Sequence, residues 1–485
     1  MTLQTHGVGP PLPRWAANAV IGLTCWMMLA CVSTADDRNQ RRVHTGRHLT
    51  LSTDLGLEAI GDEQLADMVH WFDAAVPQWI SFWNLPEGRA DQWHVDGFLM
   101  RDTGSFRSRG ELPSRIPTIK YGFASRDRIW IRHQPSLYYD RHLLLHEGIH
   151  ALAIELFGGC GPSWYMEGTA ELLATHRQPE PSSGRPLVRS LLTQPAESFR
   201  VNQIPRTKSE SPHWGRFQVI ESHRTRGTLP TLRSVLALPT DLAGSVDSYT
   251  WAWALAMLCT AYPETRELYI DAAQRGRDQS DSFTHRFVSQ IRRQAPIMEA
   301  RWRLMMHDLE YGFEWDEHRV ELSTSDDPYG GSEMELLVDA GRSWQSTGVW
   351  FPAGTTLRVR AGGECVIARQ ATGIQQDWIS RPPGISAVFH RGRPIGQLSM
   401  CVLPIQNEPA DSLRALSVVP VVDASSSLIV DSSERLPYRS ETVTVSLPSW
   451  ILFRIEDVPG TLGRHHRADN EGHYVVSISP IQDQR

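Results

Sequence analysis

The chain has 485 residues, of which 41% are hydrophobic and 21% are charged, and its formal net charge at pH 7 is -7. This length is sufficient for about three domains. The acidic balance leaves no basic surface for a polyanion, so nucleic acid is excluded as a partner.

The first 35 residues are predicted to form an export signal. After Arg14, residues 15–32 are uncharged and mostly apolar, and a short stretch of small residues ends at Ala35 before two aspartates. Two alternatives stay open: the apolar run is retained as a membrane anchor, or Cys31 is a lipidation site. We expect the protein to be exported, to the periplasm, the cell surface or the medium. It would contact a membrane only if this segment is retained or lipidated.

Removal of the signal would leave four cysteines, an even number that agrees with export. Cys160 with Cys259 and Cys365 with Cys401 would be pairs within one domain each. The alternative is that all four thiols are free.

Strands and helices alternate between the signal and residue 135. Residues 48–53 and 93–99 are predicted strands, and residues 64–83 form a predicted amphipathic helix. Residues 128–132 alternate with period two, as a half-exposed strand does. The pattern predicts a mixed α/β lobe whose last strand flanks the following helix.

That helix, predicted over residues 136–157, carries the first candidate site residues. His146 and His150 lie one turn apart on one face, so both imidazoles can reach a single metal ion. Glu147 lies between them in sequence and is free to take a proton from a metal-bound water, as a general base. His142, one turn earlier, is predicted to lie at the helix surface or to support a ligand histidine.

A third ligand is expected on the next predicted helix, residues 164–175. Catalytic zinc takes three protein ligands and leaves one position open for water, and Glu167 is the candidate for the third. Glu171 lies one turn further on the same face, where it would hydrogen-bond the outer nitrogen of a ligand histidine. His176 is predicted to be a charge partner for the dipole at the end of this helix. Residues 179–212 read as a long loop, and helical patterns dominate from 214 to 311.

The sequence His146-Glu147-Gly148-Ile149-His150, followed after sixteen residues by Glu167 in a Trp-x-x-Glu-Gly-x-Ala-Glu stretch, resembles the gluzincin metallopeptidases. The resemblance implies a zincin-like domain over residues 43–316, a bound Zn²⁺ and a peptide or protein substrate. It also implies an oxyanion donor on a later helix, for which Tyr249 is the candidate; the alternative is a structural tyrosine with a hydrogen-bonded hydroxyl. In the resembled fold, an edge strand such as 128–132 lies above the metal and pairs with extended substrate.

The composition changes after residue 316. Residues 317–331 are rich in Ser, Asp and Gly and are predicted to be a linker, and the region 332–485 shows a period of two between Gly and Pro turns. We expect this region to be an all-β sandwich that folds independently. The predicted strands are 335–338, 348–351, 356–360, 397–402, 442–447, 451–455 and 474–478.

The segments 396–400, 457–461 and 469–472 are similar to the calcium-dependent galactose-binding lectins of bacteria. The resemblance implies a Ca²⁺ ion held by Asp457, the carbonyl of Thr461, Asp469 and Asn470, which are oxygen ligands of the kind that calcium takes. It also implies carbohydrate as a possible partner. The alternative is a sandwich that keeps the lectin fold without ion or sugar.

The sequence therefore predicts an α+β zincin-like catalytic domain, with a mixed sheet and a helical lobe, followed by an all-β sandwich. The expected function is that of an exported zinc-dependent metallopeptidase. Two alternatives are a non-catalytic carbohydrate-binding protein of the cell surface with a structural zinc site, and a metal-dependent hydrolase of a non-peptide amide or ester.

Overall fold

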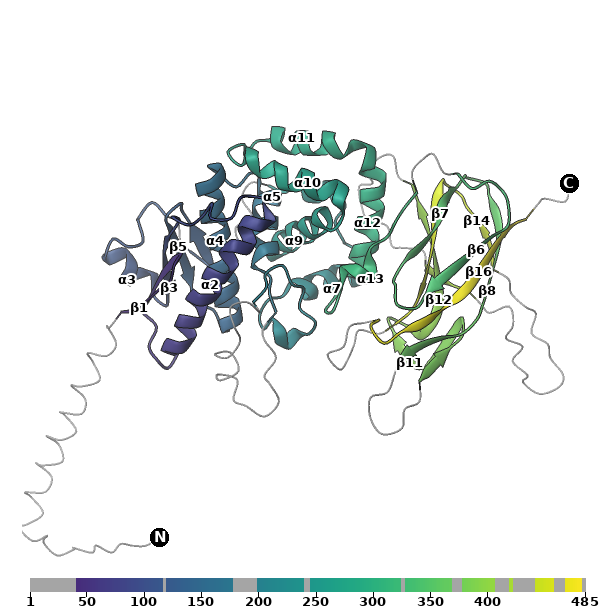
Figure 1. Cartoon of the computed structure of the whole chain (residues 1–485), viewed down its shortest axis with the longest axis horizontal. Helices are drawn as coiled ribbons and strands as arrows, with labels where there is room; N and C mark the ends of the chain where they lie inside the picture. Colours follow the sequence, from purple (N-terminus) through teal and green to yellow (C-terminus); the bar gives the residue numbers. More distant parts are fainter. Residues whose placement is uncertain are drawn as a thin grey trace, which may run out of the picture.

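A computed structural model describes residues 41–116, 119–177, 199–239, 245–323, 328–368, 377–405, 418–421, 441–457 and 467–481. The predicted signal and Thr461 lie outside these residues. The chain is a mixed α+β protein in which a mixed sheet and a set of helices come first and antiparallel sheets follow (Figure 1). Of the helices in the described ranges, none has the length and apolar character needed to cross a membrane.

The first sheet has the strand order β1-β2-β3-β5-β4. Its strands are β1 (Arg42–Thr45), β2 (Leu49–Thr53), β3 (Val95–Met100), β4 (Gly122–Ala124) and β5 (Arg128–Arg132). Strands β2, β3 and β5 are parallel, whereas β1 and β4 are antiparallel to their neighbours. The prediction that residues 128–132 form the edge strand is therefore wrong, because residues 122–124 fold back as a hairpin and cover the outer side of β5.

Each face of this sheet carries an apolar cluster. Ile129 and Ile131 of β5 belong to the main core with α2 (Asp62–Phe82) and α4 (Leu137–Phe157). Trp130 points to the opposite face, where it packs beside the short helix α3 (Thr103–Ser108) in a separate cluster. The period of two in β5 thus separates two apolar layers, and does not separate core from solvent.

The helical part begins with α5 (Ser163–Ala174), which packs on α4 and on the almost wholly buried α9 (Val246–Ala261). At Gly168 a Cβ atom would lie 2.6 Å from the carbonyl oxygen of Ala252, so only glycine allows the two helices to approach this closely. The other elements of this part, within the described residues, are η3 (Lys208–Glu210), α7 (Arg216–Arg226), α8 (Leu232–Leu236), α10 (Pro263–Ala272), η4 (Ala273–Arg275), α11 (Asp281–Ile291), η5 (Arg292–Gln294), α12 (Ala295–Asp308) and α13 (Trp315–His318).

Two antiparallel sheets follow α13. One has the order β10-β9-β16-β8-β14 with β6 paired to β16, and the other has the order β11-β12-β15-β7 with β13 paired to β12. Their facing residues form a core of their own. The strands are β6 (Met334–Asp339), β7 (Gln345–Phe351), β8 (Thr356–Gly362), β9 (Cys365–Ala368), β10 (Trp378–Ser380), β11 (Pro383–His390), β12 (Arg393–Pro404), β13 (Val418–Pro420), β14 (Glu441–Thr444), β15 (Ser449–Ile455) and β16 (Glu471–Pro480).

The helical part and the β-sheets are joined by a third buried cluster. Leu304 of α12 packs with Trp344 and Trp450 of the strand region, and Figure 1 shows α12 and α13 between the two parts of the chain. A buried guanidinium, that of Arg454 on β15, donates to the carboxylate of Asp308 at the end of α12 over 2.6 Å. The two parts therefore share apolar surface and an ion pair.

Candidate metal centre

The helices α4 and α5 bring three candidate ligands to one point. Ser136 caps the start of α4 and Gly158, in the left-handed conformation, ends it, which agrees with the helix predicted over residues 136–157. The Nε2 atoms of His146 and His150 lie 3.1 Å apart, and Oε2 of Glu167 lies 3.0 Å from the first and 3.5 Å from the second. All three side chains are buried or nearly so.

These separations fit a tetrahedral cation. Zinc bonds of about 2.0–2.1 Å to nitrogen and oxygen place neighbouring ligand atoms about 3.3 Å apart at the corners of a tetrahedron. The three observed distances lie on both sides of that value. His146, His150 and Glu167 could therefore hold one metal ion and leave the fourth corner open.

The charges at this point favour a cation. Burial alone would raise the pKa of Glu167, but His150 and His146 lower it to about 2. Burial lowers the pKa of His146, and the carboxylates of Glu167 and Glu171 outweigh it and raise the pKa to about 9. The same carboxylate of Glu167 raises the pKa of His150 against the effect of burial. A metal would replace these imidazole protons, so its binding should weaken in acid.

Glu171 supports the ligands through one buried carboxylate. Its Oε1 lies 3.4 Å from Nδ1 of His146, and its Oε2 lies 3.3 Å from Nε2 of His142. Arg216 donates to both oxygens, over 2.8 and 3.1 Å. His142 is fully buried, so it lies behind the ligands and not at the helix surface.

Arg216 and Trp214 are site residues that the sequence did not reveal. Arg216 begins α7, and the indole of Trp214 lies 3.4 Å from the carboxylate of Glu171. Both follow the segment 179–212, which the sequence predicts to be a loop and of which residues 179–198 lie outside the described residues, and no spacing rule connects them with α5. A second group of possible ligands, His142 with His146 and Glu171, also lies close together. In this second group, the guanidinium of Arg216 already supplies the positive charge that a metal ion would bring.

Glu147 lies beneath the edge strand β4. A Cβ atom at Gly122 would be only 2.3 Å from Oε1 of Glu147, so the carboxylate occupies the space that any other residue at position 122 would fill. Among the described residues, none donates a hydrogen bond to this carboxylate, and burial raises its pKa despite the nearby histidines. The group is placed to accept a proton beside the metal position.

Tyr249 lies in the first turn of α9, half-buried beside the site. Its ring centroid is 6.1 Å from that of His146, and the guanidinium of Arg216 is 5.8 Å from the ring. Burial and the charges of Glu167 and Glu147 raise the pKa of the phenol, which therefore keeps its proton and can donate.

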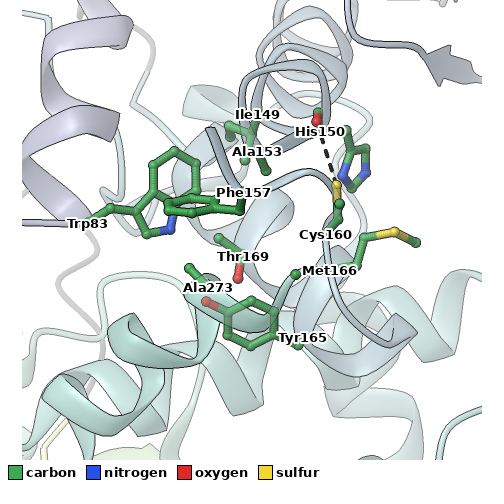
Figure 2. Close-up of a pocket in the computed structure, with 12 residues that line it drawn as sticks. Trp83, Ile149, His150, Ala153, Phe157, Cys160, Tyr165, Met166, Thr169 and Ala273 are labelled. Atoms are coloured by element: carbon green, nitrogen blue, oxygen red, sulfur yellow. Dashed lines mark hydrogen bonds between the residues drawn. The ribbon is translucent and has the colours of Figure 1, made fainter. Parts of the chain in front are cut away.

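His150 also lines a small apolar cavity (Figure 2). Trp83, Phe157 and Tyr165 line it, and its volume is about 10 Å³. A cavity of this size holds at most a single water molecule and has no room for a substrate side chain. The Cys160 thiol, which also lines the cavity, contacts the main-chain carbonyl of His150.

His176 differs from its prediction. It is fully buried, its Nδ1 donates to the carbonyl of Ala174 over 2.8 Å, and Arg141 donates to its Nε2 over 2.8 Å. Burial and the charge of Arg141 hold the pKa of His176 well below its usual range. The imidazole is therefore neutral, and the prediction of a charge partner for the helix dipole is wrong.

The predicted disulfides are also absent from the described residues, where all four cysteines have free, buried thiols. The Cys160 thiol donates to the carbonyl of His150 over 3.5 Å. Cys365 belongs to the core between the two β-sheets, whereas Cys401 belongs to the cluster shared with α12. These two side chains cannot pair because they lie in different apolar layers.

Two of the predicted calcium ligands contact each other. The amide nitrogen of Asn470 donates to the Asp457 carboxylate over 2.9 Å, and also to the carbonyl of Ala340. Arg467, which is buried, donates to the same carbonyl and to that of Ile455. Calcium would require the amide oxygen of Asn470 to face the ion. Asp469 is half-buried, and Thr461 lies outside the described residues.

Comparisons with known proteins give little beyond this geometry. No protein-family model matches the chain, and no curated protein does. Among solved structures, the chain is similar to one described as "EclA N-terminal domain; PllA-like lectin", with 18% identity over 30% of this chain and 95% of that chain. The TM-score is 0.18, and at that value the likeness carries no argument about fold or function.

Proposed function

We propose that the protein is a metal-dependent hydrolase of peptide bonds, a metallopeptidase of gluzincin type with zinc as its ion. The observation that carries the proposal is the convergence of His146, His150 and Glu167 within 3.0–3.5 Å. The nearby Glu147 carboxylate interacts electrostatically with all three and accepts no hydrogen bond from the described residues. A metal held only for structure needs no such carboxylate.

Zinc bound to the three ligands would acidify a water molecule. Glu147 would be the residue that takes up this proton and passes it to the leaving amine. The protonated phenol of Tyr249 is the candidate donor to the oxyanion of the tetrahedral intermediate. The carboxylate of Glu171 lies 3.4 Å from Nδ1 of His146, where it would favour the tautomer that presents Nε2 to the site, and Arg216 keeps Glu171 ionised.

A peptide is favoured over a small amide or ester by the open strand beside the site. β4 ends the sheet next to Glu147, and an extended chain can add to such an edge through its main-chain groups. Small amides and esters have no main chain to use this edge.

The proposed hydrolysis does not depend on the β-sheets that follow α13. A carbohydrate-binding role of this part rests on the sequence resemblance, and we propose it only as a means of bringing the hydrolase to a surface that carries sugar. Calcium in the 457–470 segment belongs to the same proposal.

Metal analysis and turnover test the proposal together. The purified protein should contain about one zinc ion, and His146→Ala and Glu167→Ala should each lose most of it. Glu147→Gln should keep the zinc and lose most hydrolysis of a peptide library, because an amide cannot accept the proton. Full zinc in both ligand variants, or undiminished turnover by Glu147→Gln, would overturn the proposal. Glu155→Gln, on the exposed end of the same helix, serves as the matched control.

A further inference from the structure

A groove of about 440 Å³ lies on the face of the first sheet opposite α4. It runs between the β4–β5 hairpin and the segment 113–116, and its volume is in the range of pockets that bind side chains and small ligands. Its lining includes Arg115, Ile116, Phe123, Asp127, Arg128 and Trp130.

The groove reaches the outer edge of β4, with which no strand of the described residues pairs. In the β4–β5 pair, the amide of Arg132 donates to the carbonyl of Tyr121 and the amide of Ser125 donates to the carbonyl of Arg128. The main-chain groups of alternate residues point to opposite sides of a strand, so those of Gly122 and Ala124 point away from β5. Ala124 also lines the groove.

A peptide added to this edge would place its side chains alternately on the two faces of the sheet. One set would face Glu147, which touches Gly122, and the other set would face Phe123 on the opposite side. Each residue advances a strand by about 3.3 Å, so Ala124 lies about 6.6 Å beyond Gly122. The groove is therefore within reach of a side chain one or three residues from the residue that faces Glu147.

The lining favours an aromatic occupant. Trp130 is buried and stacks on Phe98 at 5.9 Å, and Phe123, 6.2 Å from Trp130, is left 38% exposed. This apolar floor is bordered by two guanidinium groups and one carboxylate. Guanidinium groups are attracted to the faces of aromatic rings and repel a substrate lysine or arginine.

We propose that this groove is a specificity site for an aromatic side chain of an extended peptide substrate, held by Phe123 and Trp130 with Arg115 at the rim. The proposal rests on the peptidase function proposed above. Partial burial of one aromatic ring should give about a tenfold preference over alanine, equivalent to about 1.4 kcal/mol.

Paired peptides test this assignment. Two peptides of identical sequence carry phenylalanine or alanine at one position, and the position is moved along the chain while kcat/KM is measured. The wild-type protein should prefer phenylalanine about tenfold at one position near the scissile bond. Phe123→Ala should reduce this ratio to about one to two. Phe389→Ala, which removes a 56% exposed ring from β11, should leave the ratio unchanged.

Two further measurements keep the outcomes distinct. The melting temperature of Phe123→Ala should stay within a few degrees of wild type, and Arg115→Glu, an exposed change, should lower the phenylalanine preference without affecting folding. A preference at no position, or one that survives in Phe123→Ala, overturns the groove assignment alone. If no peptide is cleaved, binding of the labelled peptides is measured by anisotropy. Tighter binding of the phenylalanine peptide that depends on Phe123 would then uphold the groove and refute the peptidase function.

Discussion

Replacement of Gly122 by alanine should disable the general base while the metal ligands stay in place. The new Cβ atom would lie 2.3 Å from Oε1 of Glu147 and 2.7 Å from its Cδ and Cγ. Ordinary contact between such atoms needs at least about 3.4 Å, so the carboxylate has to move by about 1 Å. His146, His150 and Glu167 are not among the atoms nearest to this Cβ.

The expected loss of activity follows from that displacement. A misplacement of about 1 Å at a reacting group costs about a hundredfold in rate, which is about 2.7 kcal/mol of activation free energy. The free energy of unfolding should change much less, because the end of the Glu147 side chain can rotate and the strand itself need not shift.

The assay compares kcat on the best peptide substrate, zinc content and melting temperature for wild type and Gly122→Ala. Gly215→Ala is the control, because a Cβ there meets only Oε1 of Gln218 at 3.8 Å. We expect a hundredfold lower kcat, one retained zinc ion and a nearly unchanged melting temperature. Wild-type kcat in Gly122→Ala would refute the assignment of Glu147 as the base beneath β4.

Three further predictions concern the rest of the chain. Burial raises the pKa of Asp308, but the charge of Arg454 outweighs it and holds the pKa well below its usual range. The ionised pair therefore stabilises the fold above the unfolded pKa of about 3.9 and is lost as the pH falls through the folded value. Asp308→Asn should lower the free energy of unfolding at pH 7 by about 3 kcal/mol. This is near the low end for a broken buried pair, because Glu456 still pairs with Arg454. In chemical denaturation at several pH values, the variant should also lose less stability in acid than wild type, and equal acid dependence of the two proteins would contradict this. Millimolar calcium should raise the melting temperature of the full chain relative to chelator, and Asp457→Ala should abolish the increase; an unchanged wild-type curve would remove the calcium ion from the proposal. Intact-mass analysis should find a mature chain that begins after Ala35. A thiol reagent should label four cysteines in the unfolded, unreduced chain, and fewer labelled thiols would indicate a disulfide.

The metal site shows how much local spacing determines. His146, His150 and Glu147 lie on one helix, so their relative positions follow from the helical repeat, and the sequence predicted that helix with its cap and its end. Glu167 and Glu171 lie on the next helix after a short turn, which leaves few ways to pack the two. The convergence of these groups was therefore predictable without a tertiary structure.

Only the tertiary structure decided which groups surround that site. Arg216 reaches Glu171 across 45 positions of sequence, and no periodicity relates the two. The hairpin of β4 covers β5 because of how the chain folds back after α3, so the edge strand could not be identified from alternation alone. The charge of His176, and whether the cysteines pair, depend on which apolar layer encloses each side chain. Spacing along one helix is set by local hydrogen bonds, whereas burial, pairing and charge state are set by contacts between segments that are distant in the chain.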